Sequence, residues 1–157
     1  MKYKIKLQLL IFIFLFISLF TTGCGVNNEK TVSEIESNMK KEIKFENMVK
    51  GNNKDLKRFY HINMNDYDGV ILYIPKSTMD VSEVLIVKVK DKSQIESLED
   101  IIDTRIASQL KSFSGYGPKQ CKLINDYELK TKGNFLIFTI SKNAQEIKES
   151  FLDSIKQ

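Results

Sequence analysis

Few residues of this 157-residue chain act readily as nucleophiles or bases near neutral pH: it has two cysteines and one histidine. Cys24 has the most distinctive surroundings. It follows a lysine-rich start, an apolar run from Leu7 to Phe20 and a short stretch of small residues. This order is typical of a secretory signal that is removed by cleavage. The apolar run is too short to span a bilayer comfortably, since a spanning helix needs about 20 residues.

The residues around Cys24 resemble the signal of bacterial lipoproteins, because Thr22-Gly23-Cys24 has the small-small-cysteine order of that signal. Thr21 stands where the family usually has leucine. The resemblance implies that the Cys24 sulfur receives a diacylglycerol, that a peptidase cuts just before Cys24, and that acyl chains such as palmitate anchor the mature protein. Two acyl chains are enough for stable anchoring. The alternative is a free or disulfide-bonded Cys24 thiol beside a transmembrane anchor.

The charge balance of the mature chain differs from that of the whole chain, which has 24 basic and 20 acidic side chains. Lys2, Lys4 and Lys6 leave with the signal and no acidic residue does, so 21 basic side chains remain against 20 acidic ones. This balance gives no reason to expect nucleic acid as a partner. With Cys24 acylated, Cys121 has no cysteine with which to form an internal disulfide. We expect Cys121 to be a buried small hydrophobe rather than a reactive thiol.

The chain divides into three segments: residues 1–23 as the signal, 24–30 as the lipidated cysteine with a short polar tether, and 31–157 as a single domain. Apolar residues at helical spacing predict helices, and apolar runs bounded by turn residues predict strands. The expected helices are 32–48, 55–61, 93–113, 118–124 and 143–156. The expected strands are 70–74, 83–90, 127–132 and 134–141.

The order strand–strand–helix occurs twice in this series. Leu85-Ile86-Val87-Lys88-Val89 precedes one helix, and Leu136-Ile137-Phe138-Thr139-Ile140 precedes the other. The pattern predicts an α+β domain with a mainly antiparallel sheet, built from two strand–strand–helix units with the helices packed on one face, plus an N-terminal helix. Either a duplication or two similar solutions to one packing problem produces such a pattern.

Five segments carry a second resemblance: Leu56-Lys57-Arg58-Phe59-Tyr60, Asp66-Tyr67-Asp68-Gly69-Val70-Ile71-Leu72-Tyr73, Met79-Asp80-Val81, Leu85-Ile86-Val87-Lys88-Val89-Lys90-Asp91 and Gly115-Tyr116-Gly117-Pro118. They are similar to segments of the uncharacterised bacterial lipoproteins grouped as domain of unknown function 4358, which are common in Clostridia. The resemblance implies a lipid-anchored extracytoplasmic domain. It implies no activity, cofactor or catalytic residue.

The single histidine limits the chemistry of the domain. A metal site with two histidines is excluded, and any Cys–His or Ser–His nucleophile would have to use His61. We expect His61 to cap the end of a short helix. Asp66 and Asp68 share a loop with two asparagines, but the spacing of a calcium hand is missing, so an Asx-type turn is expected there. No cofactor and no metal are predicted.

The expected function is a non-enzymatic binding module, held by lipid on the outer face of the cytoplasmic membrane. Its candidate partner is another envelope protein or a peptide. Its candidate surface combines the loops 63–69 and 114–118, with Asp66, Tyr67, Asp68 and Tyr116 as contact residues. The glycines on either side of Tyr116 allow tight turns that present its ring, whereas packing of the ring on the sheet is the alternative.

An enzyme is the alternative function. It would be a small cell-envelope hydrolase or wall-modifying accessory enzyme that uses His61 or acidic residues. A cleft that gathers His61, a carboxylate, and either a serine or Cys121 would favour this alternative.

Overall fold

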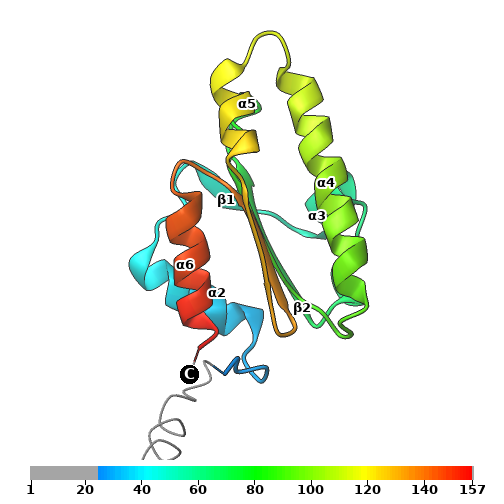
Figure 1. Cartoon of the computed structure of the whole chain (residues 1–157), viewed down its shortest axis with the longest axis vertical. Helices are drawn as coiled ribbons and strands as arrows, with labels where there is room; N and C mark the ends of the chain where they lie inside the picture. The colour runs from blue at the N-terminus through cyan, green and yellow to red at the C-terminus, as the bar shows by residue number, and fades with distance from the viewer. Residues whose placement is uncertain (1–24, 157) are drawn as a thin grey trace, which may run out of the picture.

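Residues 25–156, which are the residues that the computed structural model describes, form an α+β domain with one five-stranded sheet (Figure 1). Its helices are α2 (Val32–Glu42), α3 (Asn53–Tyr60), α4 (Gln94–Phe113), α5 (Pro118–Asn125) and α6 (Ala144–Ser154), with a 3-10 turn η2 (Met64–Asp66). Its strands are β1 (Met48–Lys50), β2 (Gly69–Pro75), β3 (Glu83–Lys88), β4 (Glu128–Lys132) and β5 (Phe135–Ile140). Within this part of the chain, no helix is long and apolar enough to cross a membrane.

The sheet has the strand order β1-β2-β3-β5-β4, and each neighbouring pair is antiparallel. The predicted α+β class and antiparallel sheet are therefore confirmed. All six residues of β5 are buried, as are five of the six residues of β3. A strand that is buried along its whole length needs cover on both faces of the sheet.

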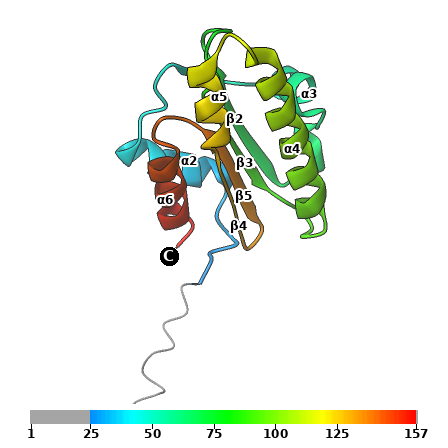
Figure 2. The same cartoon turned by 45° about the horizontal axis from the view of Figure 1, so that its top comes forward.

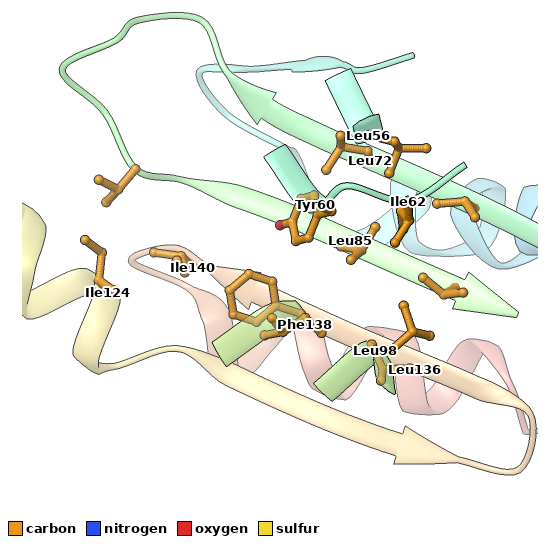
Figure 3. Close-up of a cluster of buried hydrophobic side chains, with 14 of the residues drawn as sticks. Leu56, Tyr60, Ile62, Leu72, Leu85, Leu98, Ile124, Leu136, Phe138 and Ile140 are labelled. Carbon is orange, nitrogen blue, oxygen red and sulfur yellow. The ribbon is translucent and has the colours of Figure 1, made fainter. Parts of the chain in front are cut away.

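The first face of the sheet is covered by α3, α4 and α5 (Figure 3). The strands contribute a row of aliphatic and aromatic side chains to this face, namely Leu72, Leu85, Val87, Leu136, Phe138 and Ile140. The three helices contribute Leu56, Tyr60, Leu98, Ile102 and Ile124. The helical stripe predicted for residues 93–113 therefore packs on the sheet through its central residues.

The second face is covered by α2 and α6, which pack against each other. The intervening strand residues point to this face, namely Ile71, Tyr73, Val84, Ile86, Phe135 and Ile137. The expectation that the helices pack on one face is therefore wrong. The central strands are apolar on both sides, so helices on one face alone would leave the other apolar face in water.

The two strand–strand–helix units do not repeat in space. A two-fold rotation that superposed β2 on β4 and β3 on β5 would have its axis perpendicular to the sheet. Such a rotation would leave each face of the sheet on its own side. However, α4 lies on the first face and α6 on the second. The shared order of elements is therefore not accompanied by a two-fold symmetry of the helices.

The N-terminal helix is shorter than the predicted 32–48. Thr31 and Glu34 form a capping box at the start of α2, and the chain becomes extended at Ile43. Residues 48–50 instead form β1, which pairs with the end of β2. Ile43 continues the helical spacing of the preceding apolar residues, but it packs on the second face from an extended backbone. Pairing with β2 thus prevails over the local helical pattern.

The first described residues are packed against the domain. The Asn27 N–H donates a hydrogen bond of 3.0 Å to the carbonyl oxygen of Ile155, just after α6. Val26 lies close against Gly133 in the β4–β5 turn. Most of the predicted tether 24–30 is therefore part of the fold. Cys24 and the signal 1–23 lie outside the described residues.

The domain has two opposite ends, which Figures 1 and 2 show. We call one the tether end and define it by residues 25–31, 63–69 and 132–134. We call the other the distal end and define it by residues 76–82, 114–118 and 141–143. α4 runs from the tether end to the distal end, and its 20 residues span about 30 Å.

A buried carboxylate ties α2 to the sheet on the second face. Glu36 accepts hydrogen bonds from Lys40 Nζ at 2.8 Å, from Lys50 Nζ at 2.6 Å and from the Tyr73 hydroxyl. Burial works to raise the pKa of Glu36, but the hydrogen bonds from Lys40, Lys50 and Tyr73 outweigh it and lower that pKa from 4.5 to about 2. The ionised form of Glu36 therefore stabilises the folded state.

We expect Glu36→Gln to lower the free energy of unfolding at pH 7 by about 1–3 kcal/mol, because both lysines are half exposed and solvent screens part of the interaction. The contribution of Glu36 is complete above its unfolded pKa of 4.5 and is lost as the pH falls toward its folded pKa of about 2. Chemical denaturation of both proteins at several pH values measures the difference. A difference that stays constant from pH 7 to pH 2 would contradict this account.

Candidate functional site

The two loops predicted to form one surface lie at opposite ends of the domain. Asp66, Tyr67 and Asp68 belong to the tether end, beside the start of α4. Tyr116 belongs to the distal end, just after α4. The four candidate contact residues therefore divide into two separate surfaces.

The loop 63–69 leads into β2 and is bonded to the end of β3. The Asn63 side chain accepts a hydrogen bond from the Asn65 N–H at 3.2 Å, which is the expected Asx-type turn. The Asp68 N–H donates to the carbonyl oxygen of Lys88 at 2.9 Å. Tyr67 is half-buried against the first-face core, and burial raises the pKa of its hydroxyl. The exposed residues of this loop are Asn65, Asp66 and Asp68.

The loop 114–118 presents an aromatic ring to solvent. Gly115 has a φ of +87°, which favours glycine, and a side chain on Gly117 would collide with the Phe113 ring. Pro118 then begins α5. Tyr116 is 62% exposed, and its ring contacts only the edge of the core at Phe113, with 5.8 Å between centroids. The ring is therefore displayed and does not pack on the sheet.

A groove of about 720 Å³ lies beside this loop at the distal end. Its walls come from the chain after α2, the loop 76–82, α5 and the loop 141–143. The Gln120 side chain donates to the carbonyl oxygen of Met79 at 3.0 Å and so joins the loop 76–82 to α5. Met79 is 59% exposed at the edge of the groove. The distal end thus displays two large apolar side chains, Met79 and Tyr116.

A buried ion pair lies on the first face, between the start of β3 and the middle of α4. Glu83 is fully buried, and its carboxylate accepts hydrogen bonds from Arg105 Nε at 3.2 Å and from Arg105 Nη2 at 2.8 Å. Burial raises the pKa of Glu83, and the positive charge of Arg105 opposes that rise. Burial also raises the pKa of Tyr60, which lies beside the pair and whose hydroxyl makes no hydrogen bond within residues 25–156.

A cavity of about 500 Å³ lies over this ion pair, between α3 and α4. Arg58, His61 and Arg105 line it together with the hydroxyl-bearing residues Thr104 and Ser108. His61 caps the end of α3, as expected, with a left-handed backbone at φ 57°. The imidazole makes no hydrogen bond to another group of the described chain.

A hydrolase would be favoured by a cleft that gathers His61, a carboxylate, and either a serine or Cys121, and only part of this group is brought together. His61 and Ser108 line the same cavity, but no carboxylate lines it. The nearby Glu83 is bound by Arg105. Cys121 lies outside this cavity and packs, half-buried, against the first-face core. Among residues 25–156, no group of three His, Cys, Asp or Glu side chains is placed to hold a metal ion.

No sequence motif marks Glu83, Arg105 or Arg58 as a site residue. A charged residue at the head of an apolar strand, as Glu83 is, signals a partner in the fold. The identity of that partner is a tertiary property, because Arg105 is 22 residues away and belongs to another element. Arg58 stands within a segment that shows apolar spacing and the family resemblance, and neither marks Arg58 as a site residue.

The fold and these sites define an α+β domain with helices on both faces of an antiparallel sheet. The family described as a domain of unknown function (DUF4358) matches residues 41–141, and the chain belongs to this family. No curated protein and no solved structure matches the chain. The matched range runs from the end of α2 to β5 and so includes the whole sheet and the helices of the first face. Arg58, Glu83 and Arg105 all lie within it.

Proposed function

We propose that this protein is a lipid-anchored, extracytoplasmic binding module that displays its distal end to a protein or peptide of the cell envelope. Cys24 is the proposed anchor, and the outer face of the cytoplasmic membrane is the proposed location. The single observation that supports this arrangement is that the first described residues pack at the tether end, where Val26 lies against the β4–β5 turn and Asn27 bonds to Ile155, whereas Met79 and Tyr116 belong to the distal end.

The position of Gly25 matters because Cys24 is bonded directly to it. Val26, Asn27 and Lys30 contact the domain, so only one described residue, with a reach of about 3.5 Å, separates Cys24 from the packed chain. Acyl chains on Cys24 would then hold the tether end at the bilayer surface. The distal end would stand about 30 Å further out, which is the length of α4. Exposed aromatic and methionine side chains are typical anchors of protein interfaces.

We expect Cys24→Ala to abolish acylation and to release or mislocalise the protein, because the acyl chains have no other attachment point. Labelled palmitate fed to the cells should enter the wild-type chain and not the variant. Cys121→Ser is the matched control, since it removes the other thiol and should leave the labelling unchanged. Equal labelling of wild type and Cys24→Ala would contradict the lipid anchor.

We expect Tyr116→Ser to weaken capture of the partner by about tenfold in crosslinking on intact cells, because the ring buries area in a partner at little entropic cost. Thermal unfolding should be almost unchanged, because the ring is mostly exposed. The control is the double variant Asp66→Asn, Asp68→Asn, which changes the tether end only.

The same experiment distinguishes the other candidate surfaces and functions. Loss of capture in the Asp66→Asn, Asp68→Asn control, with Tyr116→Ser unaffected, would place the binding surface at the tether end. The hydrolase alternative is favoured by His61 and Ser108 in one cavity. Loss of the cellular phenotype in His61→Ala, with a normal melt and normal capture, would support that alternative against the binding module.

A further inference from the structure

We propose that the cavity between α3 and α4 binds a small ligand through an oxyanion, either a carboxylate or a phosphate, with Arg58 and Arg105 as its charged contacts. This site is separate from the distal surface and does not depend on the proposed function. The cavity volume of about 500 Å³ is in the range of small-molecule sites.

The first observation is the convergence of two guanidinium groups on one aromatic ring. Arg105 Cζ lies 4.6 Å from the centroid of the Phe59 ring, and Arg58 Cζ lies 5.1 Å from the same centroid. Each contact with the ring is attractive, and both arginines line the cavity, so two cationic groups border it. Arg58 has no carboxylate partner within residues 25–156. An anion in the cavity would compensate the charge of Arg58.

The second observation is that Arg105 is held in place and still has a donor to offer. Its Nε and Nη2 atoms bond to the fully buried Glu83, which fixes the plane of the guanidinium. Its Nη1 atom makes no hydrogen bond in the described part of the chain. A guanidinium that is oriented before binding loses little freedom when an oxyanion arrives.

The third observation concerns the remaining wall of the cavity. Ser108 supplies a hydroxyl group, and His61 supplies an imidazole that can donate or accept a hydrogen bond. The Thr104 hydroxyl also lines the cavity but already donates to the carbonyl oxygen of Asp100 at 3.0 Å. No aspartate or glutamate lines this cavity. Glu83 lies behind Arg105 and balances its charge, so Arg58 supplies the unbalanced positive charge at the cavity. An anionic ligand therefore fits the cavity better than a cationic one.

Calorimetric titration of the full chain in a nonionic detergent tests this proposal. Inorganic phosphate and malonate serve as separate probes for the phosphate and carboxylate sources. We expect at least one of them to bind, and Arg58→Gln to weaken that binding by about tenfold, since a charge-assisted hydrogen bond is lost. Lys57→Gln is the matched control, because Lys57 is the adjacent exposed cation on α3 and does not line the cavity.

Each outcome of the titration bears on the site. Tighter binding of phosphate than of malonate identifies a phosphate-bearing ligand, and the reverse identifies a carboxylate. Absence of binding by both probes up to about 10 mM would overturn the proposal. An equal loss in Lys57→Gln and Arg58→Gln would also overturn it, because the interaction would then be with general surface charge. None of these results depends on acylation or on capture of a partner.

Discussion

Arg105→Met is expected to lower the free energy of unfolding by about 3–5 kcal/mol at pH 7, because it leaves the Glu83 carboxylate buried and without its counter-charge. Glu83 is fully buried, and the Arg105 side chain is only 13% exposed, so water replaces little of the lost interaction. Methionine has a similar length to the arginine stem and retains part of its packing against Phe59. Urea denaturation of the variant and the wild type measures the loss.

The loss of stability in Arg105→Met should depend on pH in a predictable direction. Burial already raises the pKa of Glu83 in the wild type, where the charge of Arg105 opposes the rise. Without that charge, Glu83 in the folded variant keeps its proton at a pH where the unfolded chain has released it. The folded state then binds more protons than the unfolded state, so stability falls as the pH rises above the unfolded pKa of Glu83. The deficit of Arg105→Met relative to the wild type should therefore be largest near pH 7 and should shrink toward pH 5.

A double variant separates the effect of charge from the effect of packing. Glu83→Gln combined with Arg105→Met removes both charges at once and is expected to be more stable than Arg105→Met alone at pH 7. Its deficit relative to the wild type should change less with pH. A double variant that is less stable than the single one, or a deficit of the single variant that does not vary with pH, would contradict an unpaired buried carboxylate as the cause.

Most elements of the fold could be predicted because each has a strong local pattern. The apolar stripe of α4 and the continuous apolar run of β5 are visible in the sequence, and the structure places both elements within a few residues of their expected bounds. β1 could not be found in this way. Its three residues are too few to show a period, and it exists because the edge of β2 is there to pair with it.

The distribution of helices over the two faces was wrongly predicted although its signal was present. Runs such as Leu136-Ile137-Phe138-Thr139-Ile140 do not alternate between apolar and polar residues, and such strands are covered on both faces. The second cover, α2 with α6, follows from this observation. The sequence does not indicate which helix packs on which face, because α4 and α6 both have an amphipathic pattern that fits either face.

The candidate sites also differ in whether they depend on local sequence or on tertiary contacts. The display of Tyr116 follows from local chemistry, since glycines on both sides form a turn that leaves the ring exposed. The cavity over Arg105 depends on contacts between α3, β3 and α4, which are far apart in the sequence. A single sequence gives no information on such contacts, so the Glu83–Arg105 pair had to come from the structure.

Ile102→Ala is expected to lower the free energy of unfolding by about 2–5 kcal/mol, because Ile102 is fully buried at the middle of α4 against the first face of the sheet. The lost methyl groups leave a cavity between α4 and β3–β5 that these rigid elements cannot close. For a domain of ordinary stability, about 5–15 kcal/mol, this is a large fraction of the total.

The matched control for Ile102→Ala is Asp103→Ala, one residue further along the same helix. Asp103 is exposed, so its replacement removes no core contact and should change the stability by less than about 0.5 kcal/mol. Urea denaturation of the two variants therefore tests the orientation of α4 directly, because adjacent helical residues point about 100° apart. Equal effects of the two substitutions would mean that α4 does not present Ile102 to the sheet, and the first-face core would then need a different set of residues.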